Sequence, residues 1–267
     1  MTARAAPATR EQARSLAARS LAARSLRATL DLVLPRVCVS CERPLESNKD
    51  DLVCALCWSR LAALPSPRCS RCGHPTEGRS CRFCATLPPF VRSARSVCWV
   101  PHEIGSAIVY ALKYHGWTAT AREMAERMAR LAWPADVVAE RAALVPVPLA
   151  RARARERGFN QAALLAASLS AHWQVPSWSD VLLRTRSTGT QTRLTPGERS
   201  ANVRHAFEVP GGSHGASARM RGLHLVLVDD VLTTGATLNA CAAVLFEAGA
   251  RTISYVTFGR ARASGDR

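Results

Sequence analysis

The chain lacks long apolar runs, and this absence limits where the protein can reside. No stretch of about 18 consecutive apolar residues occurs in the 267 residues, so no membrane-spanning helix is expected. The N-terminus also lacks a compact apolar segment followed by a cleavage site, which a secretory signal would need. These absences predict a cytoplasmic protein, in which the ten cysteines serve as metal ligands or buried thiols rather than in disulfides.

Lysine, acidic residues and aromatic residues are also scarce. Lys49 and Lys113 are the only lysines, yet arginine raises the formal net charge to +16. Two interpretations stay open: the arginine excess reflects a GC-rich genome, or it binds phosphate groups or nucleic acid. Aromatic residues make up 6% of the chain, which gives little support to a surface that stacks nucleobases.

Residues 1–24 form a region of low complexity. The sequence Ala-Arg-Ser-Leu recurs at 13–16, 18–21 and 23–26, a five-residue period that fits neither a helix face nor a strand. We expect a disordered basic tail here, with a nucleic-acid-binding arm as the alternative. Residues 26–34 are apolar enough for a short helix that leads into a cysteine-rich region.

Eight of the ten cysteines form four C-x-x-C pairs, and this pattern predicts metal binding. Each pair presents two thiolates on a tight turn, and two pairs complete a tetrahedral Cys₄ zinc site. All ligand positions are then occupied, so both sites should be structural, and a redox role is disfavoured. The pairs are Cys38 and Cys41, Cys54 and Cys57, Cys69 and Cys72, and Cys81 and Cys84.

A short repeat suggests how the pairs combine. The first and third pairs are each followed by a proline, Pro44 and Pro75, whereas the second and fourth are not. This pattern is typical of a duplicated unit and favours sequential sites, the first within residues 38–57 and the second within residues 69–84. Interleaved pairing is the alternative. His74 is expected to be a bystander rather than a ligand.

The segment 225–237 carries the main functional signal. Leu225 to Val228 are apolar, as in a strand of a parallel sheet that is buried on both faces. Asp229 and Asp230 follow at the carboxyl end of that strand, where α/β sheets bind ligands. A hydroxyl-rich loop, Thr233 to Thr237, then leads into a helix whose N-terminal amides suit a phosphate. A ribose 5-phosphate would satisfy both parts, with its diol on the acids and its phosphate in the loop.

The sequence disfavours two other interpretations of this segment. A strand ending in two aspartates could be a Walker B element, but the chain contains no G-x-x-x-x-G-K-[ST] motif. It could also be the acidic pocket of a receiver domain, which would leave the threonine-rich loop unexplained. The rest of residues 92–262 alternates strands with helices, which predicts a mostly parallel sheet. Strands are expected at 96–100, 143–147, 225–228 and 251–258, and helices at 104–114, 119–132, about 161–171 and 236–248.

The segment resembles the 5-phosphoribosyl-1-diphosphate (PRPP) motif of type I phosphoribosyltransferases, and the whole chain resembles the ComF family. The family pattern contains the four cysteine pairs, then Leu-Lys-Tyr-His-Gly ending at Gly116, then Val-Pro-Val-Pro leading to Arg-Gly-Phe-Asn-Gln ending at Gln161, and then the PRPP motif. The resemblance implies a double zinc ribbon with its leader helix over 25–90, and a phosphoribosyltransferase-like α/β domain over 92–262. This α/β domain would contain a mostly parallel sheet flanked by helices.

The resemblance also assigns roles to residues. Asp229 and Asp230 would bind the ribose diol, which makes them the catalytic candidates, and Mg²⁺ would accompany PRPP. The loop from Arg151 to Arg157 would meet the diphosphate with help from Lys113, although these arginines could equally form a solvated helix face. Residues 191–204 would be a mobile flap, and no catalytic base is apparent. The 5-phosphate would be held by Thr233, Thr234, Gly235, Ala236 and Thr237.

Two functions from different classes follow. The first is a Mg²⁺- and PRPP-dependent transferase that acts on an unidentified nitrogenous acceptor. The second is a competence protein that handles single-stranded DNA, works with the DNA-uptake machinery and keeps the PRPP pocket for binding or regulation. The sequence determines neither the acceptor nor the oligomeric state.

Overall fold

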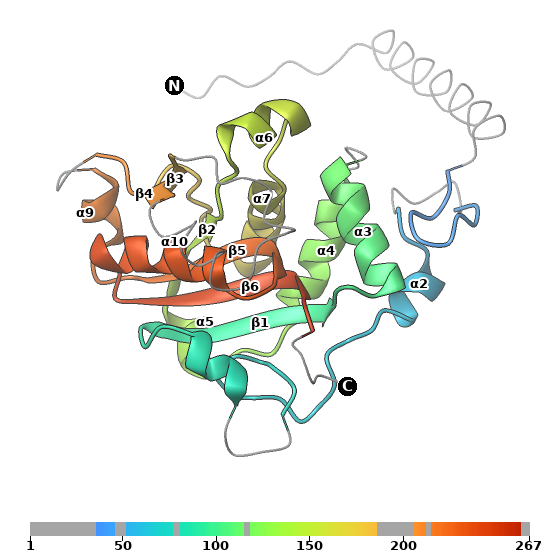
Figure 1. The fold of residues 1–267 in the computed structure, drawn as a ribbon, viewed down its shortest axis with the longest axis horizontal. Coiled ribbons are helices and arrows are strands. Elements are labelled where there is room, and N and C mark those ends of the chain that lie inside the picture. Colours follow the sequence, from blue (N-terminus) through green and yellow to red (C-terminus); the bar gives the residue numbers. More distant parts are fainter. Residues whose placement is uncertain are drawn as a thin grey trace, which may run out of the picture.

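The computed structural model describes residues 36–45, 52–76, 81–114, 118–185, 206–211 and 215–262. Its centre is a parallel four-stranded sheet in the order β1-β6-β5-β2 (Figure 1). The strands are β1 (Val91–Trp99), β2 (Arg141–Pro146), β5 (His224–Leu232) and β6 (Thr252–Arg260). The predicted α/β architecture is therefore confirmed.

Helices connect the parallel strands, as the crossover connections of such a sheet require. Helices α3, α4 and α5 lie between β1 and β2, helices α6 and α7 follow β2, and α10 joins β5 to β6 (Figure 1). Their bounds are Glu103–Tyr114, Thr120–Ala129, Ala135–Glu140, Arg151–Arg157, Gln161–Trp173 and Ala236–Glu247. The smaller elements are α2 (Ala55–Ser59), a 3₁₀ helix (Arg82–Thr86), the antiparallel pair β3 (Leu183–Arg184) and β4 (Phe207–Glu208), and α9 (Ala216–Met220).

The sheet separates two apolar cores, because successive side chains of a strand point to opposite faces. Leu225 and Leu227 of β5 pack in a core shared with α10, which we call the α10 core. Val226 and Val228 pack in a core with α3, α4 and α7, which we call the α7 core. Both faces of β5 are thus covered, which explains why its sequence is apolar without alternation.

The two predicted ribbons lie on opposite faces of this sheet. Cys38 and Cys57 of the first ribbon are buried in the α7 core. Cys72 of the second ribbon is buried in the α10 core, together with Leu87 just after it. The ribbons therefore straddle the sheet at its β1 edge and share the cores of the α/β domain, which compensates for the few large apolar residues of their own.

Several sequence-based expectations lie outside the described residues: the tail at 1–24, the helix at 26–34, the last two residues of the Leu-Lys-Tyr-His-Gly turn, and the flap at 191–204. Among the described parts of the chain, no helix is long and apolar enough to cross a membrane.

The arginine-rich segment after β2 differs from the expected loop. Residues 151–157 form helix α6, because alternating arginine and alanine both favour helix. Gly158 ends the helix in a left-handed conformation with φ of 77°. Strand β1 also starts earlier than expected, at Val91 rather than at residue 96. The helix predicted at 236–248 is confirmed as α10.

Glu123 of α4 fastens the first ribbon to the α/β domain. Its side chain is only 5% exposed. Oε1 accepts a hydrogen bond from the Leu52 amide at 2.8 Å, and Oε2 accepts one from Trp58 Nε1 at 3.0 Å. The guanidinium of Arg127 lies 3.3 Å from the centre of the Trp58 ring. One buried carboxylate thus joins the two ends of segment 52–58, which contains the second cysteine pair.

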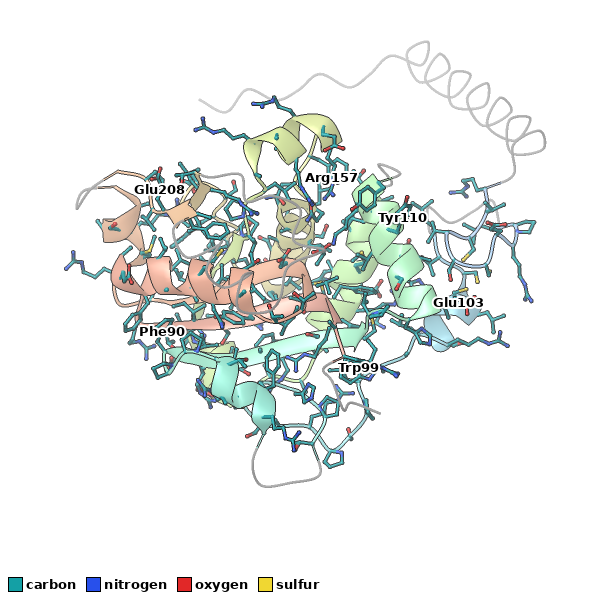
Figure 2. All side chains as sticks on the ribbon, in the orientation of Figure 1. Phe90, Trp99, Glu103, Tyr110, Arg157 and Glu208 are labelled. Carbon is teal, nitrogen blue, oxygen red and sulfur yellow. The ribbon has the colours of Figure 1, made fainter. Side chains whose placement is uncertain are left out.

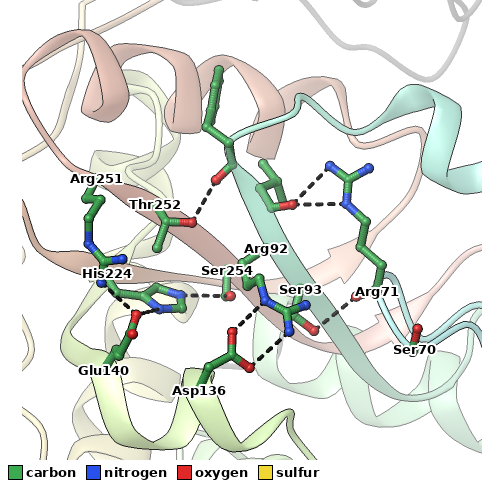
Figure 3. Close-up of polar contacts among 12 residues, drawn as sticks. Ser70, Arg71, Arg92, Ser93, Asp136, Glu140, His224, Arg251, Thr252 and Ser254 are labelled. Atoms are coloured by element: carbon green, nitrogen blue, oxygen red, sulfur yellow. Dashed lines mark hydrogen bonds and ion pairs between the residues drawn. The ribbon is translucent and has the colours of Figure 1, made fainter.

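A polar cluster occupies the opposite end of the sheet, where β5 and β6 begin (Figure 3). His224 is 1% exposed, and its Nε2 lies 2.9 Å from Ser254 Oγ. Glu140 accepts a hydrogen bond from Arg251 at 2.6 Å and lies 3.9 Å from His224 Nδ1. Burial lowers the pKa of His224 below its ordinary value, although Glu140 opposes this effect.

We expect Glu123→Ala to lower the free energy of unfolding by about 3 kcal/mol, because two hydrogen bonds to a buried carboxylate are lost. Urea unfolding followed by Trp fluorescence would measure this. The matched control is Glu126→Ala on the same helix, an exposed carboxylate paired with Arg130, whose loss should cost less than about 0.5 kcal/mol. Equal effects of the two substitutions would contradict the anchoring role of Glu123.

The buried His224 predicts acid sensitivity. Because its folded-state pKa is lowered, the unfolded state binds more protons below about pH 6.5, and stability should fall as the pH falls through that region. His224→Gln should show a smaller loss between pH 7.5 and pH 5.5 in urea unfolding. The zinc-ligand thiols titrate equally in both proteins, so parallel pH profiles would show that His224 does not contribute.

Candidate functional site

The two adjacent aspartates lie within strand β5, which runs to Leu232 rather than ending at Val228 as the sequence predicted. The carboxyl end of β5 lies at the same edge of the sheet as those of the other parallel strands. Asp229 is opposite Thr257 of β6 in the register. Asp229 Oδ1 accepts a hydrogen bond from the Asp230 amide, and Asp230 Oδ1 accepts one from the Val231 amide, both at 2.9 Å. These bonds hold the carboxylates in fixed orientations at the end of the strand.

Lys113, from the last turn of α3, forms an ion pair with Asp230 Oδ2. The two side chains are 23% and 6% exposed, so the contact is largely shielded from water. Burial lowers the pKa of Lys113, but the charge of Asp230, its hydrogen bond and the charge of Asp229 outweigh that effect, so the pKa is raised. Lys113 therefore forms one cluster with Asp229 and Asp230, from which it is far apart in the sequence.

Asp229 has the more perturbed carboxyl group. Burial and the neighbouring charge of Asp230 raise its pKa well above the ordinary value, while Lys113 opposes this rise. A ligand that donates hydrogen bonds or brings a cation would therefore stabilise the ionised form of Asp229. Ribose hydroxyls and Mg²⁺ both have this property, and carboxylate oxygens are ligands that Mg²⁺ accepts. The donor set thus fits the expected metal and sugar.

The threonine-rich loop follows directly and turns into α10. Gly235 has a φ of 81°, and a Cβ there would meet its nearest neighbours at 3.6 Å or more. The left-handed backbone, rather than space, therefore requires glycine at this position. Thr234 Oγ1 accepts a hydrogen bond from the Ala236 amide at 3.4 Å. The first amides of a helix have no partner within it, so the N-terminus of α10 is suited to an anion.

Helix α6 divides its arginines between two faces. Residues four apart share a helix face, so Arg153 and Arg157 lie on one side and Arg151 and Arg155 on the other. Arg157 donates to Gln161 Oε1 at 2.6 Å, and its guanidinium lies 5.2 Å from the centre of the Tyr114 ring. Figure 2 shows Arg157 beside the upper end of α3. Of Arg151 and Arg157, which begin and end the segment expected to meet the diphosphate, only Arg157 turns toward the helix that carries Lys113.

Arg184 on β3 is a candidate that sequence reasoning missed. It is partly buried, its guanidinium lies 5.4 Å from the centre of the Phe207 ring, and burial lowers its pKa. The charges of Arg153 and Asp229 act on it, which associates it with the acidic cluster. Its position just before the expected flap was the only signal in the sequence.

The cysteine pairs combine sequentially, as the duplication predicted. In each group of four, the sulfur atoms all lie within 4.8 Å of one another. The Sγ atoms of Cys69 and Cys84 are 3.4 Å apart, and those of Cys41 and Cys54 are 3.7 Å apart. Such spacings suit a tetrahedral zinc ion with Zn–S bonds of about 2.3 Å. The two groups are Cys38, Cys41, Cys54 and Cys57, and Cys69, Cys72, Cys81 and Cys84.

His74 and the cysteines outside the four pairs also lie in the environments that the sequence predicts. His74 is not part of either group; it is buried and stacks on Phe83 with ring centres 5.7 Å apart. Cys98 and Cys241, the two remaining cysteines, are fully buried in the cores. For Cys38, burial raises the pKa, but hydrogen bonds from backbone amides outweigh it and lower the pKa to about 7. Such amides favour the thiolate that zinc requires.

Comparison with a protein-family model agrees with the arrangement of the cysteines. The family described as a double zinc ribbon domain matches residues 29–87. Among solved structures, the chain is similar to the glutamine phosphoribosylpyrophosphate (PRPP) amidotransferase from B. subtilis complexed with ADP and GMP. That similarity has a TM-score of 0.36 and 17% identity, and it covers 53% of this chain and 26% of that one.

Two curated relatives are similar over most of their length. The DNA utilization protein YhgH of Salmonella typhimurium is 33% identical over 234 residues, which cover 83% of this chain and 96% of the relative. Competence protein F of Haemophilus influenzae is 30% identical over 237 residues, covering 85% and 96%. With this degree of identity over most of the chain and nearly all of each relative, the chain belongs to the family of these proteins, the ComF family.

Proposed function

We propose that the protein binds PRPP with Mg²⁺ and transfers its phosphoribosyl group to a nitrogenous acceptor. The observation that carries this proposal is the arrangement near the end of β5. Asp229 and the Lys113-paired Asp230 lie a few residues before a loop that turns at Gly235 into the N-terminus of α10. A ligand that carries both a sugar diol and a phosphate would match these two features.

Each part of the site would then have a role. Asp229 and Asp230 would accept hydrogen bonds from the ribose hydroxyls, and the loop from Thr233 to Thr237 would hold the 5-phosphate. Lys113 and Arg157 would screen the charge that develops on the departing diphosphate. Mg²⁺, when bound, would supply further screening of the diphosphate oxygens. Loss of diphosphate builds positive charge at C1, so positioning and screening would provide most of the catalysis.

A second candidate is the handling of single-stranded DNA. The relatives named above are a DNA utilization protein and a competence protein. The chain has a net charge of +16, and Arg151 and Arg155 are exposed on the outer face of α6. This face would bind the DNA backbone, and the competence machinery would be the partner. The PRPP pocket would then serve for binding or regulation. The reduced thiols of two Cys₄ sites fit a cytoplasmic location for either function.

The central test is Asp229→Asn, which keeps the shape of the side chain and removes the charge that the ribose hydroxyls would meet. A hydrogen bond to a charged group contributes about 1.5–3 kcal/mol, so Mg-PRPP binding should weaken by about 10- to 150-fold. Calorimetry with PRPP, and with ATP as a control ligand, would measure this. Wild-type protein that ignores PRPP, or a variant that binds it equally well, would refute the proposal.

The effect of Asp230→Asn on PRPP binding is harder to interpret than that of Asp229→Asn. The substitution leaves the shielded Lys113 without its ion-pair partner, so it should also lower the stability of the fold. Its unfolding midpoint should therefore be compared with that of Asp229→Asn. Release of diphosphate from PRPP, with and without a panel of nucleobases, would separate turnover from binding.

The two faces of α6 allow the two candidate functions to be separated. Arg157→Gln should weaken PRPP binding, whereas Arg155→Gln should leave it unchanged, because only Arg157 turns toward α3. If the outer face binds DNA, Arg155→Gln should weaken single-stranded DNA binding and reduce its salt dependence by about one charge. Fluorescence anisotropy at several salt concentrations would show this. Unchanged DNA binding in Arg155→Gln would mark a solvated face.

A further inference from the structure

The second ribbon is fastened to the sheet by arginines, whereas the first is fastened by a glutamate. The turn from Cys69 to Cys72 exposes three carbonyl oxygens to the α/β domain. Arg95 of β1 donates to the Ser70 carbonyl at 2.8 Å and to the Arg71 carbonyl at 3.0 Å. Arg260 of β6 donates to the Cys72 carbonyl at 2.6 Å. Two strands thus direct guanidinium groups at one metal-binding turn.

Arg260 is unusual because it is charged and 0% exposed. It is the last residue of β6, and its guanidinium lies 4.6 Å from the centre of the Phe83 ring. In the sequence, Phe83 lies between Cys81 and Cys84, two ligands of the second site. A buried charge needs a compensating charge nearby. Four thiolates around one Zn²⁺ form a dianion, which would supply that charge. Burial raises the pKa of Cys72, and the charge of Arg260 opposes this effect.

Two contacts connect this ribbon to opposite ends of the threonine-rich loop. Arg260 is opposite Leu232 in the β5–β6 register, and the Ala261 amide donates to the Leu232 carbonyl at 2.8 Å, directly before Thr233. Beyond the loop, the side chain of Asn239 donates from Nδ2 to the Thr86 carbonyl at 2.7 Å. The backbone amide of Asn239 donates to the Gly235 carbonyl at 2.8 Å. The ribbon therefore reaches the loop from both β6 and α10.

We propose that Arg260 and Arg95 are the counter-ions of the second zinc site, and that metal bound there holds the Thr233–Thr237 loop in its binding geometry. Zinc at the second site and PRPP would then stabilise each other, since coupling between two sites is reciprocal. The counter-ion part is independent of the function proposed above, whereas the coupling part rests on it. The first site, anchored by Glu123, should show no such coupling.

The counter-ion role is tested by zinc release from the full-length protein into a chromophoric zinc chelator, with alkylation of freed thiols and peptide mapping to identify the site. The Arg260→Met variant should release zinc from the second group of cysteines about 10- to 100-fold faster than the wild type. Loss of a residue that supports metal ligands typically weakens metal binding by that factor. Release from the first group should be unchanged. The matched control is Arg262→Met, which removes an exposed arginine two residues further along.

Further variants keep this test decisive. If Arg260→Met does not fold, Arg95→Met gives the same comparison from the other strand, and Arg260→Lys should restore most of the retention because it keeps the charge. Equal release from wild type and both methionine variants would overturn the counter-ion role. Equal acceleration at both sites would show a general loss of stability and overturn it as well.

The coupling is tested by adding Mg-PRPP to the same release assay. Zinc loss from the second group should slow by about fivefold or more, while loss from the first group stays constant. Asn239→Ala should abolish this protection while still binding PRPP. PRPP that binds but protects neither site, or both sites equally, would overturn the coupling. Failure to bind PRPP at all would instead refute the proposed function and leave the counter-ion result standing.

Discussion

The rest of the structure depends on a parallel sheet whose central strands must be covered on both faces. Strands β5 and β6 are apolar on both sides, so each face requires its own core, and the helices of the crossover connections provide most of the cover. The β1 edge would be the least protected part of such a sheet. The two cysteine ribbons lie there, one on each face, and each contributes buried cysteines to a different core. The ribbons and the sheet are therefore one packing unit.

The same constraint concentrates charge at the carboxyl edge of the sheet. Side chains within the strands are committed to the two cores, so polar groups can gather only where the strands end. Lys113, Asp229 and Asp230 meet there because α3 returns its last turn to the end of β5. In this shielded cluster the pKa of Lys113 and the pKa of Asp229 are both raised, so a ligand that donates hydrogen bonds or brings a cation would stabilise the ionised form of Asp229.

Two different solutions attach the two ribbons. A buried carboxylate on α4 binds the first through an amide and an indole, and guanidinium groups on β1 and β6 bind the second through carbonyl oxygens. The difference matters because a Cys₄ zinc site is anionic: arginines favour it electrostatically, whereas a glutamate gives it no such support. The contacts of the second ribbon also lead to the Thr233–Thr237 loop, so under our proposals metal bound in this ribbon would affect ligand binding at that loop.

The sequence alone determined those features whose cause is local. The C-x-x-C pairs with their repeated proline predicted two sequential metal sites, and the apolar run before Asp229 and Asp230 predicted a buried parallel strand with acids at its end. Gly235 and the threonines predicted the turn into α10. Each of these depends on neighbouring residues or on a fixed spacing, and the structure agrees with them.

Only the tertiary structure decided which distant groups meet. Lys113 was singled out by its rarity, but its pairing with Asp230 follows from the path of α3. The alternating arginines of 151–157 looked equivalent in the sequence, and helix formation separated Arg157 from Arg151 and Arg155. The buried Arg260 gave no local signal, and Arg184 gave only its position just before the expected flap, because their contacts come from elements that are adjacent in space and distant in the chain. Burial and counter-charge are properties of the packed molecule, and a linear pattern does not contain them.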